Sequence, residues 1–200
     1  MLTENKNGQI YDMKMTDIED WNLRKLKNDS RAYRLIFNFC LERLIDSLNA
    51  ISGNLYTKEH ESITYNRLIY ELEEGIMEKN YGNLELIYEC LPVSLVNNAI
   101  FSSIGYFNSW KRERIKLDIT IPFPKGISCK DMPSFVIGSK KKPIEFSSKG
   151  LYLSKIGRFK ISGSDEEKRN LFGIYNKVKV FYKNSDCTWY CKFDLRNRKY

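Results

Sequence analysis

The sequence predicts an α+β protein, in which a helical segment with three main helices precedes a small, curved, antiparallel β-barrel-like sheet. Apolar residues recur at helical spacing through the first 110 positions, and the spacing then changes to alternation. Pro, Gly and Ser gather between the alternating runs, as expected of short strands joined by turns. We therefore expect an N-terminal arm at 1–30 that can hold a strand, a helical segment at 31–114 and a basic β segment at 115–200.

The composition is that of a folded protein with a core. Hydrophobic residues make up 42% of the 200 residues and aromatic residues 14%, whereas disordered chains are poor in both. No apolar run approaches the ~18–20 residues that span a bilayer. The first residues also lack the apolar stretch of a secretory signal. These observations predict a cytoplasmic protein without a membrane partner.

The first predicted helix begins at Arg31, with Asp29 or Ser30 as its N-cap. Arg34 and Asn38 share a flank of this helix, where they can meet solvent or a ligand. Its apolar residues form one stripe at helical spacing: Ile36, Phe37, Cys40, Leu41, Leu44, Ile45 and Leu48.

Two further helices follow. One is expected from about Thr57 to Asn80, with an acidic face that we interpret as solvated. The other begins at Pro92, a residue suited to a first helical turn, and ends near the basic run 110–114.

The β segment is predicted to begin with an alternating strand at 115–121, and 123–149 to form a long loop with short extended pieces. Leu151–Ile161 is expected to form one strand with a bulge or sharp bend at Gly157. The alternation in Val178–Leu195, broken by the turn residues Asn184–Asp186, predicts a β-hairpin.

Several kinds of chemistry are disfavoured by the residues themselves. His60 is the only histidine, which excludes sites that need several histidines. The five cysteines are scattered, and we interpret Cys187 and Cys191 as apolar fillers on one strand face. The carboxylate run Asp165–Glu167 is interpreted as a solvated loop. We therefore expect no catalytic residues, metal or cofactor.

The two halves of the chain differ in charge. Residues 1–110 hold 11 Lys and Arg against 16 Asp and Glu, whereas residues 111–200 hold 22 against 9. The net charges are −5 and +13, which together make the net +8 of the chain. A basic half points to a polyanion partner, with nucleic acid favoured over an anionic membrane surface.

Basic residues interleaved with aromatic ones can neutralise phosphates and stack bases. The interleaved aromatic residues that we single out are Phe135, Phe146, Tyr152, Tyr175 and Tyr182. The predicted nucleic-acid-binding residues, including those of the helical segment, are Arg34, Asn38, Lys111, Arg112, Arg114, Lys140, Lys141, Lys142, Lys155, Arg158, Lys160, Lys177 and Lys179. Lys177 and Lys179 alternate on one strand, so they are expected to project from the same sheet face.

The order of several short motifs over about residues 30–195 resembles the transposon-encoded TnpB family, relatives of the compact type V CRISPR effectors. The resemblance is carried by five pieces: Tyr33-Arg34 with Asn38 and Leu41, Leu91-Pro92 with Ala99, Phe107 and Trp110-Lys111, Pro133-Ser134-Phe135, Leu151–Lys160, and Trp189-Tyr190 with Phe193.

The resemblance implies a helical recognition segment and a barrel-like wedge segment that bind a guide RNA, target double-stranded DNA or both. In that family a RuvC-like domain supplies the catalytic carboxylates. Because the printed chain stops at Tyr200, we expect a non-catalytic or truncated protein, whose RuvC-containing half would be a second polypeptide encoded directly downstream. Two alternatives stay open: a protein-binding adaptor or inhibitor that acts through the acidic helical half, and an independent metal nuclease.

Overall fold

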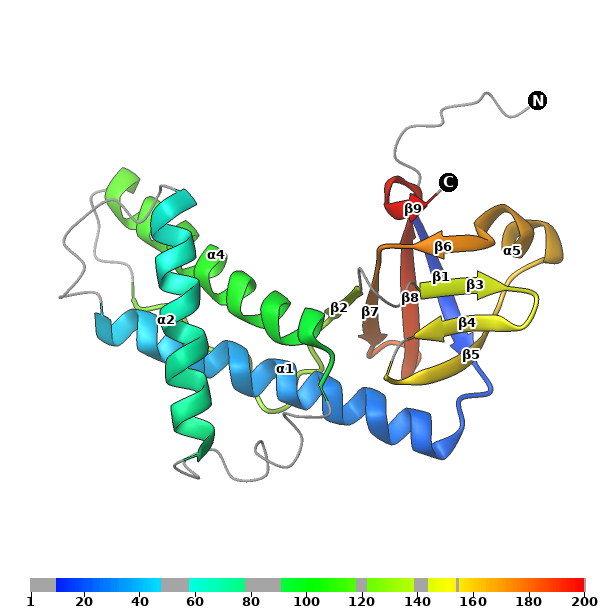
Figure 1. The fold of residues 1–200 in the computed structure, drawn as a ribbon, viewed down its shortest axis with the longest axis horizontal. Coiled ribbons are helices and arrows are strands. Elements are labelled where there is room, and N and C mark those ends of the chain that lie inside the picture. Colours follow the sequence, from blue (N-terminus) through cyan, green and yellow to red (C-terminus); the bar gives the residue numbers. More distant parts are fainter. Residues whose placement is uncertain are drawn as a thin grey trace. The chain divides into compact units, whose positions relative to one another are not determined.

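The protein has an α+β fold with a curved antiparallel sheet, which confirms the predicted fold class (Figure 1). The computed structural model describes residues 10–47, 58–77, 91–117, 122–138, 144–153 and 155–199. Within them lie four α-helices and nine strands.

The chain divides into two compact units. The sheet unit comprises Met1–Ser30, Leu91–Leu95 and Met132–Tyr200, and the helical unit comprises Arg31–Cys90 and Val96–Asp131. One boundary falls within helix α1 (Asp20–Asp46) and another within helix α4 (Val93–Leu117).

Polar and aromatic contacts join the three helices of the helical unit. Helix α2 (Lys58–Met77) reaches α1 through an ion pair between Glu71 and Arg43, with 3.9 Å between nitrogen and oxygen. On its other side Tyr65 donates a hydrogen bond of 2.6 Å to Asn97 of α4, and its ring stacks on Phe101 at 4.7 Å between centroids. The apolar stripe predicted in α1 is buried from Ile36 to Leu44. No helix among the described residues is long and apolar enough to cross a membrane.

The sheet unit contains all nine strands. Every neighbouring pair is antiparallel, in the order β2-β7-β8-β1-β5-β4-β3-β6-β9. The strands are β1 (Ile10–Thr16), β2 (Phe135–Gly138), β3 (Ile144–Ser147), β4 (Gly150–Leu153), β5 (Gly157–Ile161), β6 (Gly173–Tyr175), β7 (Lys177–Lys183), β8 (Thr188–Asp194) and β9 (Arg198–Lys199).

The sheet curls around an aromatic core but does not close. Phe146 of β3 stacks on Phe193 of β8 with 5.2 Å between ring centroids, although three strands separate β3 from β8 in the sheet order. The ring of Tyr175 in β6 also contacts that of Phe193, with 5.2 Å between centroids. These rings contact one another because alternate residues of each strand point to the concave side.

Helix α1 begins earlier than predicted. Asp29 and Ser30 lie inside the helix and are buried, so neither is its N-cap. Both side chains have partners there: Lys25 pairs with the Asp29 carboxylate, and the Ser30 hydroxyl donates to the Pro133 carbonyl at 3.2 Å. A residue that usually caps a helix can sit in its interior when its side chain finds partners there, as the Ser30 hydroxyl does. The second carboxylate oxygen of Asp29 is buried without a hydrogen-bond partner.

The prediction of a strand at 115–121 is wrong for residues 115–117, because helix α4 continues to Leu117. Arg114 and Lys116 lie in the last turn, where positive charge interacts favourably with the helix dipole. Residues 118–121 lie outside the described part of the chain.

Three other local predictions need correction. Leu151–Ile161 is two strands, β4 and β5, which pair as a hairpin through a turn that includes Lys155 at φ +65°. Cys187 lies exposed in the β7–β8 turn and does not share a strand face with buried Cys191. Asp165–Glu167 opens a short helix, α5 (Asp165–Leu171), whose capping box joins Ser164 and Glu167.

Candidate nucleic-acid interface

The outer face of strands β1, β7 and β8 carries lysines around a pair of aromatic rings. Alternation places them there: Val178, Val180 and Cys191 point into the core, so the residues between them point outward. We call this surface the basic–aromatic face and define it by Lys14, Lys177, Lys179, Phe181, Lys183, Tyr190 and Lys192.

Phe181 and Tyr190 form the centre of the basic–aromatic face. They are cross-strand partners on β7 and β8, with ring centroids 5.6 Å apart and an angle of 23° between the rings. Both rings are half-buried rather than part of the core. Lys14 of β1 is the partner of Tyr190 on its other side. Aromatic rings beside cations suit bases and phosphates together.

Lysines surround the two rings at close range. The Lys183 ammonium lies 4.2 Å from the centroid of Tyr190, and that of Lys192 lies 5.8 Å from the centroid of Phe181. These are cation–π contacts. Lys192 also pairs with Asp12 at 3.5 Å, whereas Lys179 and Lys177 are exposed along the neighbouring strand.

The Tyr190 hydroxyl donates a hydrogen bond of 2.5 Å to the carboxylate of Asp186 in the β7–β8 turn. This bond to Asp186 raises the pKa of Tyr190 above its usual value. The bond also ties the end of the Tyr190 side chain to the β7–β8 turn.

Among the predicted residues, Lys177 and Lys179 lie on the basic–aromatic face. Arg158 and Lys160 project together from β5, where Arg158 lies 5.7 Å from the Tyr152 ring centroid and Lys160 pairs with Asp17 at 2.9 Å. Lys155 lies in the β4–β5 turn and donates to the Leu91 carbonyl at 2.9 Å. The structure therefore separates the two strand sets, since β1 and β8 lie between β5 and β7.

Arg34 and Asn38 hold a loop of the helical unit. Arg34 donates to the backbone carbonyls of Cys129 and Asp131, at 2.8 and 3.2 Å. Asn38 bonds the backbone of Ile127 twice: its amide donates at 3.0 Å and its oxygen accepts at 2.7 Å. These contacts give both side chains a structural role.

The other predicted residues of the helical unit lie near the end of α4. Arg112 donates to the Asn108 carbonyl at 3.4 Å, and Arg114 lies 5.6 Å from the Trp110 ring centroid. Lys111 is half-buried. Lys140, Lys141 and Lys142 lie outside the described residues.

Burial contradicts a binding role for three of the five aromatic residues predicted from the sequence, whereas Tyr152 is half-exposed beside Arg158. Phe135, Phe146 and Tyr175 are buried in the core, and Tyr182 packs on Trp189 with 5.4 Å between centroids. Phe181 and Tyr190, the ring pair of the basic–aromatic face, were not among the aromatic residues singled out in the sequence. Phe181 lies two residues after Lys179, and Tyr190 lies two residues before Lys192. Because residues two apart on a strand share a face, this spacing could have indicated that the two rings lie among the lysines.

Within the described ranges, no three His, Cys, Asp or Glu side chains are grouped as a metal ion would require. The sequence matches no protein-family model and no curated protein.

Proposed function

We propose that the protein binds nucleic acid through the basic–aromatic face and does not itself catalyse a reaction. The observation that carries this proposal is the Phe181–Tyr190 ring pair on an outer sheet face bordered by five lysines. Lysines supply the sequence-independent attraction to phosphates, and the half-buried rings add stacking on unpaired bases.

The arrangement costs stability, which supports a binding role. Lys179 and Lys192 are directly opposed cross-strand partners, and like charges in that position destabilise a sheet. Asp12 offsets only part of this charge through its pair with Lys192. A phosphate backbone laid along the face would relieve the remaining repulsion.

We further propose that the chain is a TnpB-like protein of the cytoplasm, which binds guide RNA, target DNA or both. The motif order in the sequence supports it, and so does the presence of both a helical unit and a unit with a curved sheet.

The test is the salt dependence of binding to a labelled RNA and DNA. If the protein neutralises about 6–10 phosphates, affinity should fall by about 10³–10⁵-fold between 50 and 200 mM salt. The double variant Lys177→Glu/Lys179→Glu should bind more weakly. Its plot of log affinity against log salt should be less steep, by about one to two units of slope.

The matched control is Arg24→Glu/Lys27→Glu, which makes the same change in net charge at two exposed positions of α1 in the same unit. It should bind nearly as the wild type. Equal loss in both variants would mean that net charge alone attracts the ligand. Capture of a protein that survives nuclease treatment, with no bound RNA or DNA, would favour the adaptor instead.

A further inference from the structure

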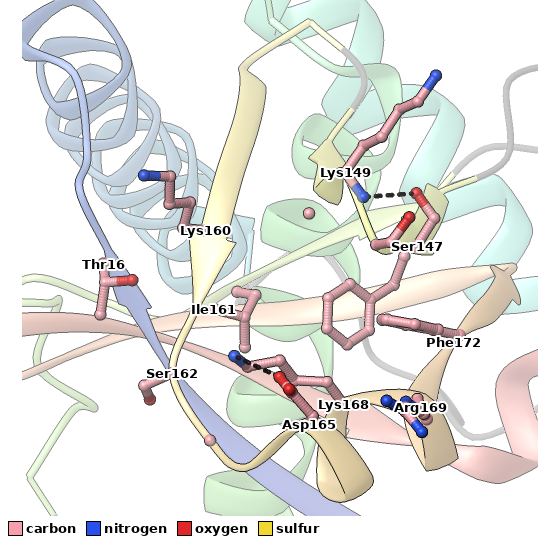
Figure 2. Close-up of a pocket in the computed structure, with 14 residues that line it drawn as sticks. Thr16, Ser147, Lys149, Lys160, Ile161, Ser162, Asp165, Lys168, Arg169 and Phe172 are labelled. Carbon is pink, nitrogen blue, oxygen red and sulfur yellow. Dashed lines mark hydrogen bonds and ion pairs between the residues drawn. The ribbon is translucent and has the colours of Figure 1, made fainter.

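The sheet unit contains a cleft that shares no residue with the basic–aromatic face. It has a volume of about 610 Å³ and lies between the β3–β4 turn, the end of β5 and helix α5 (Figure 2). Pockets of about 300–1,000 Å³ are the usual size for small ligands and cofactors. The cleft is therefore large enough for a ligand of nucleotide size.

Cations dominate the lining of the cleft. Four basic residues and one acidic residue are among those that line it, so the net charge of the lining residues is +3. Lys168 pairs with Asp165 at 3.8 Å, and Lys160 pairs with Asp17, which lies outside the lining. The two other cations are Lys149 of the β3–β4 turn and Arg169 of α5, both exposed.

The cleft also offers hydroxyl groups and an apolar surface. Hydroxyls come from Thr16 and from serines in the β3–β4 turn and after β5. The apolar side chains of Ile161 and Phe172 also line the cleft (Figure 2). Phe172 is half-buried and meets the ring of Phe146 edge to face at 5.2 Å.

Helix α5 is held in place by contacts that do not use its lining side chains. The Ser164–Glu167 capping box fixes its start. At its end the Tyr175 hydroxyl donates to the Leu171 carbonyl at 2.6 Å, and Arg198 donates to the carbonyls of Asn170 and Phe172. Arg169 and Phe172 are thus presented from a fixed backbone, which lowers the entropy lost when a ligand binds.

We propose that this cleft binds a nucleoside 5′-phosphate, either free or at the end of a strand. The phosphate fits the cations at the rim, with Arg169 able to bind its oxygens through a guanidinium fork. The base fits the apolar surface at Phe172. A simple anion would leave most of the volume and the apolar side unused. The proposal does not rest on the proposed function, because the basic–aromatic face contributes nothing to the cleft.

The experiment is a calorimetric titration of the full chain with adenosine 5′-monophosphate, and separately with adenosine and with inorganic phosphate. The nucleotide should bind saturably and more tightly than either fragment. Arg169→Glu should weaken it by about 10–150-fold, the range expected for loss of a hydrogen bond to a charged group. Lys149→Glu, in a different element, should weaken it as well.

Two controls separate this site from the rest of the protein. Lys177→Glu/Lys179→Glu should bind the nucleotide as the wild type does, and thermal unfolding should show that the Arg169 variant is folded. A 5′-phosphorylated oligonucleotide that binds more tightly than its 5′-hydroxyl form, with the difference lost in Arg169→Glu, would identify a strand end as the source. Equal binding of the two oligonucleotides would identify the free nucleotide. Absence of saturable nucleotide binding, or binding unchanged in both cleft variants, would overturn the proposal.

Discussion

Lys179 of β7 lies directly opposite Lys192 of β8 in the antiparallel ladder, so two ammonium groups share one side of the sheet. Such a pair lowers stability, whereas an opposite-charge pair in the same register contributes about 0.2–1 kcal/mol. This relationship allows binding and stability to be changed in opposite directions.

Lys179→Glu should therefore raise the free energy of unfolding slightly, measured by urea denaturation, while nucleic-acid affinity falls. Fluorescence anisotropy at several salt concentrations measures the affinity. The control is Lys27→Glu, an exposed position on α1 with the same charge change. A more stable variant that binds as tightly as the wild type would remove Lys179 from the interface.

Tyr190→Ala should weaken binding to a single-stranded oligonucleotide by about 1–3 kcal/mol, which is the usual contribution of one base–aromatic stack. Tyr190→Phe keeps the ring and loses only the hydrogen bond to Asp186, so it should retain most of the affinity. Titration of labelled oligonucleotide compares the two. If the Phe variant loses as much as the Ala variant, the hydroxyl rather than stacking is responsible.

Asn38→Ala should destabilise the protein by about 1–3 kcal/mol, because the Ile127 backbone loses both bonds to the Asn38 amide. The salt slope of nucleic-acid binding should not change. Denaturation and binding are measured on the same variant. Unchanged stability with a large loss of affinity would show that Asn38 contacts the ligand, as the sequence alone predicted.

Asp29 should make the fold more stable at acidic pH than at neutral pH, relative to Asp29→Asn. Burial raises the pKa of Asp29 above the usual 3.8, although the hydrogen bond from Lys25 acts to lower it. A raised pKa means that the folded state binds the proton more tightly. This contribution is therefore complete below pH 3.8 and is lost as the pH rises through the folded pKa.

Urea unfolding of both proteins between about pH 3 and 7 measures the difference, since the other carboxylates cancel between them. The wild type should lose stability relative to the Asn variant as the pH rises. A relative gain would mean that the charge of Lys25 outweighs burial.

The alternation in the β7–β8 segment by itself determined which side chains share a face. A strand repeats every two residues, so Val178 and Val180 point inward whenever Lys177 and Lys179 point outward. The buried side of α1 could likewise be predicted from the sequence, because burial there follows the helical spacing of the apolar residues. These features depend only on neighbours along the chain.

Only the tertiary structure decided which strands are neighbours. The basic–aromatic face brings Lys14 next to Tyr190 because β8 pairs with the N-terminal strand β1. These two residues are 176 positions apart, and no local pattern encodes their contact. The same holds for the cleft, which joins the β3–β4 turn to α5, and for Ser30 inside α1, whose hydroxyl donates to the distant Pro133 carbonyl. Periodicity specifies how a residue is oriented on its element, whereas register and long-range packing determine its neighbours on the surface.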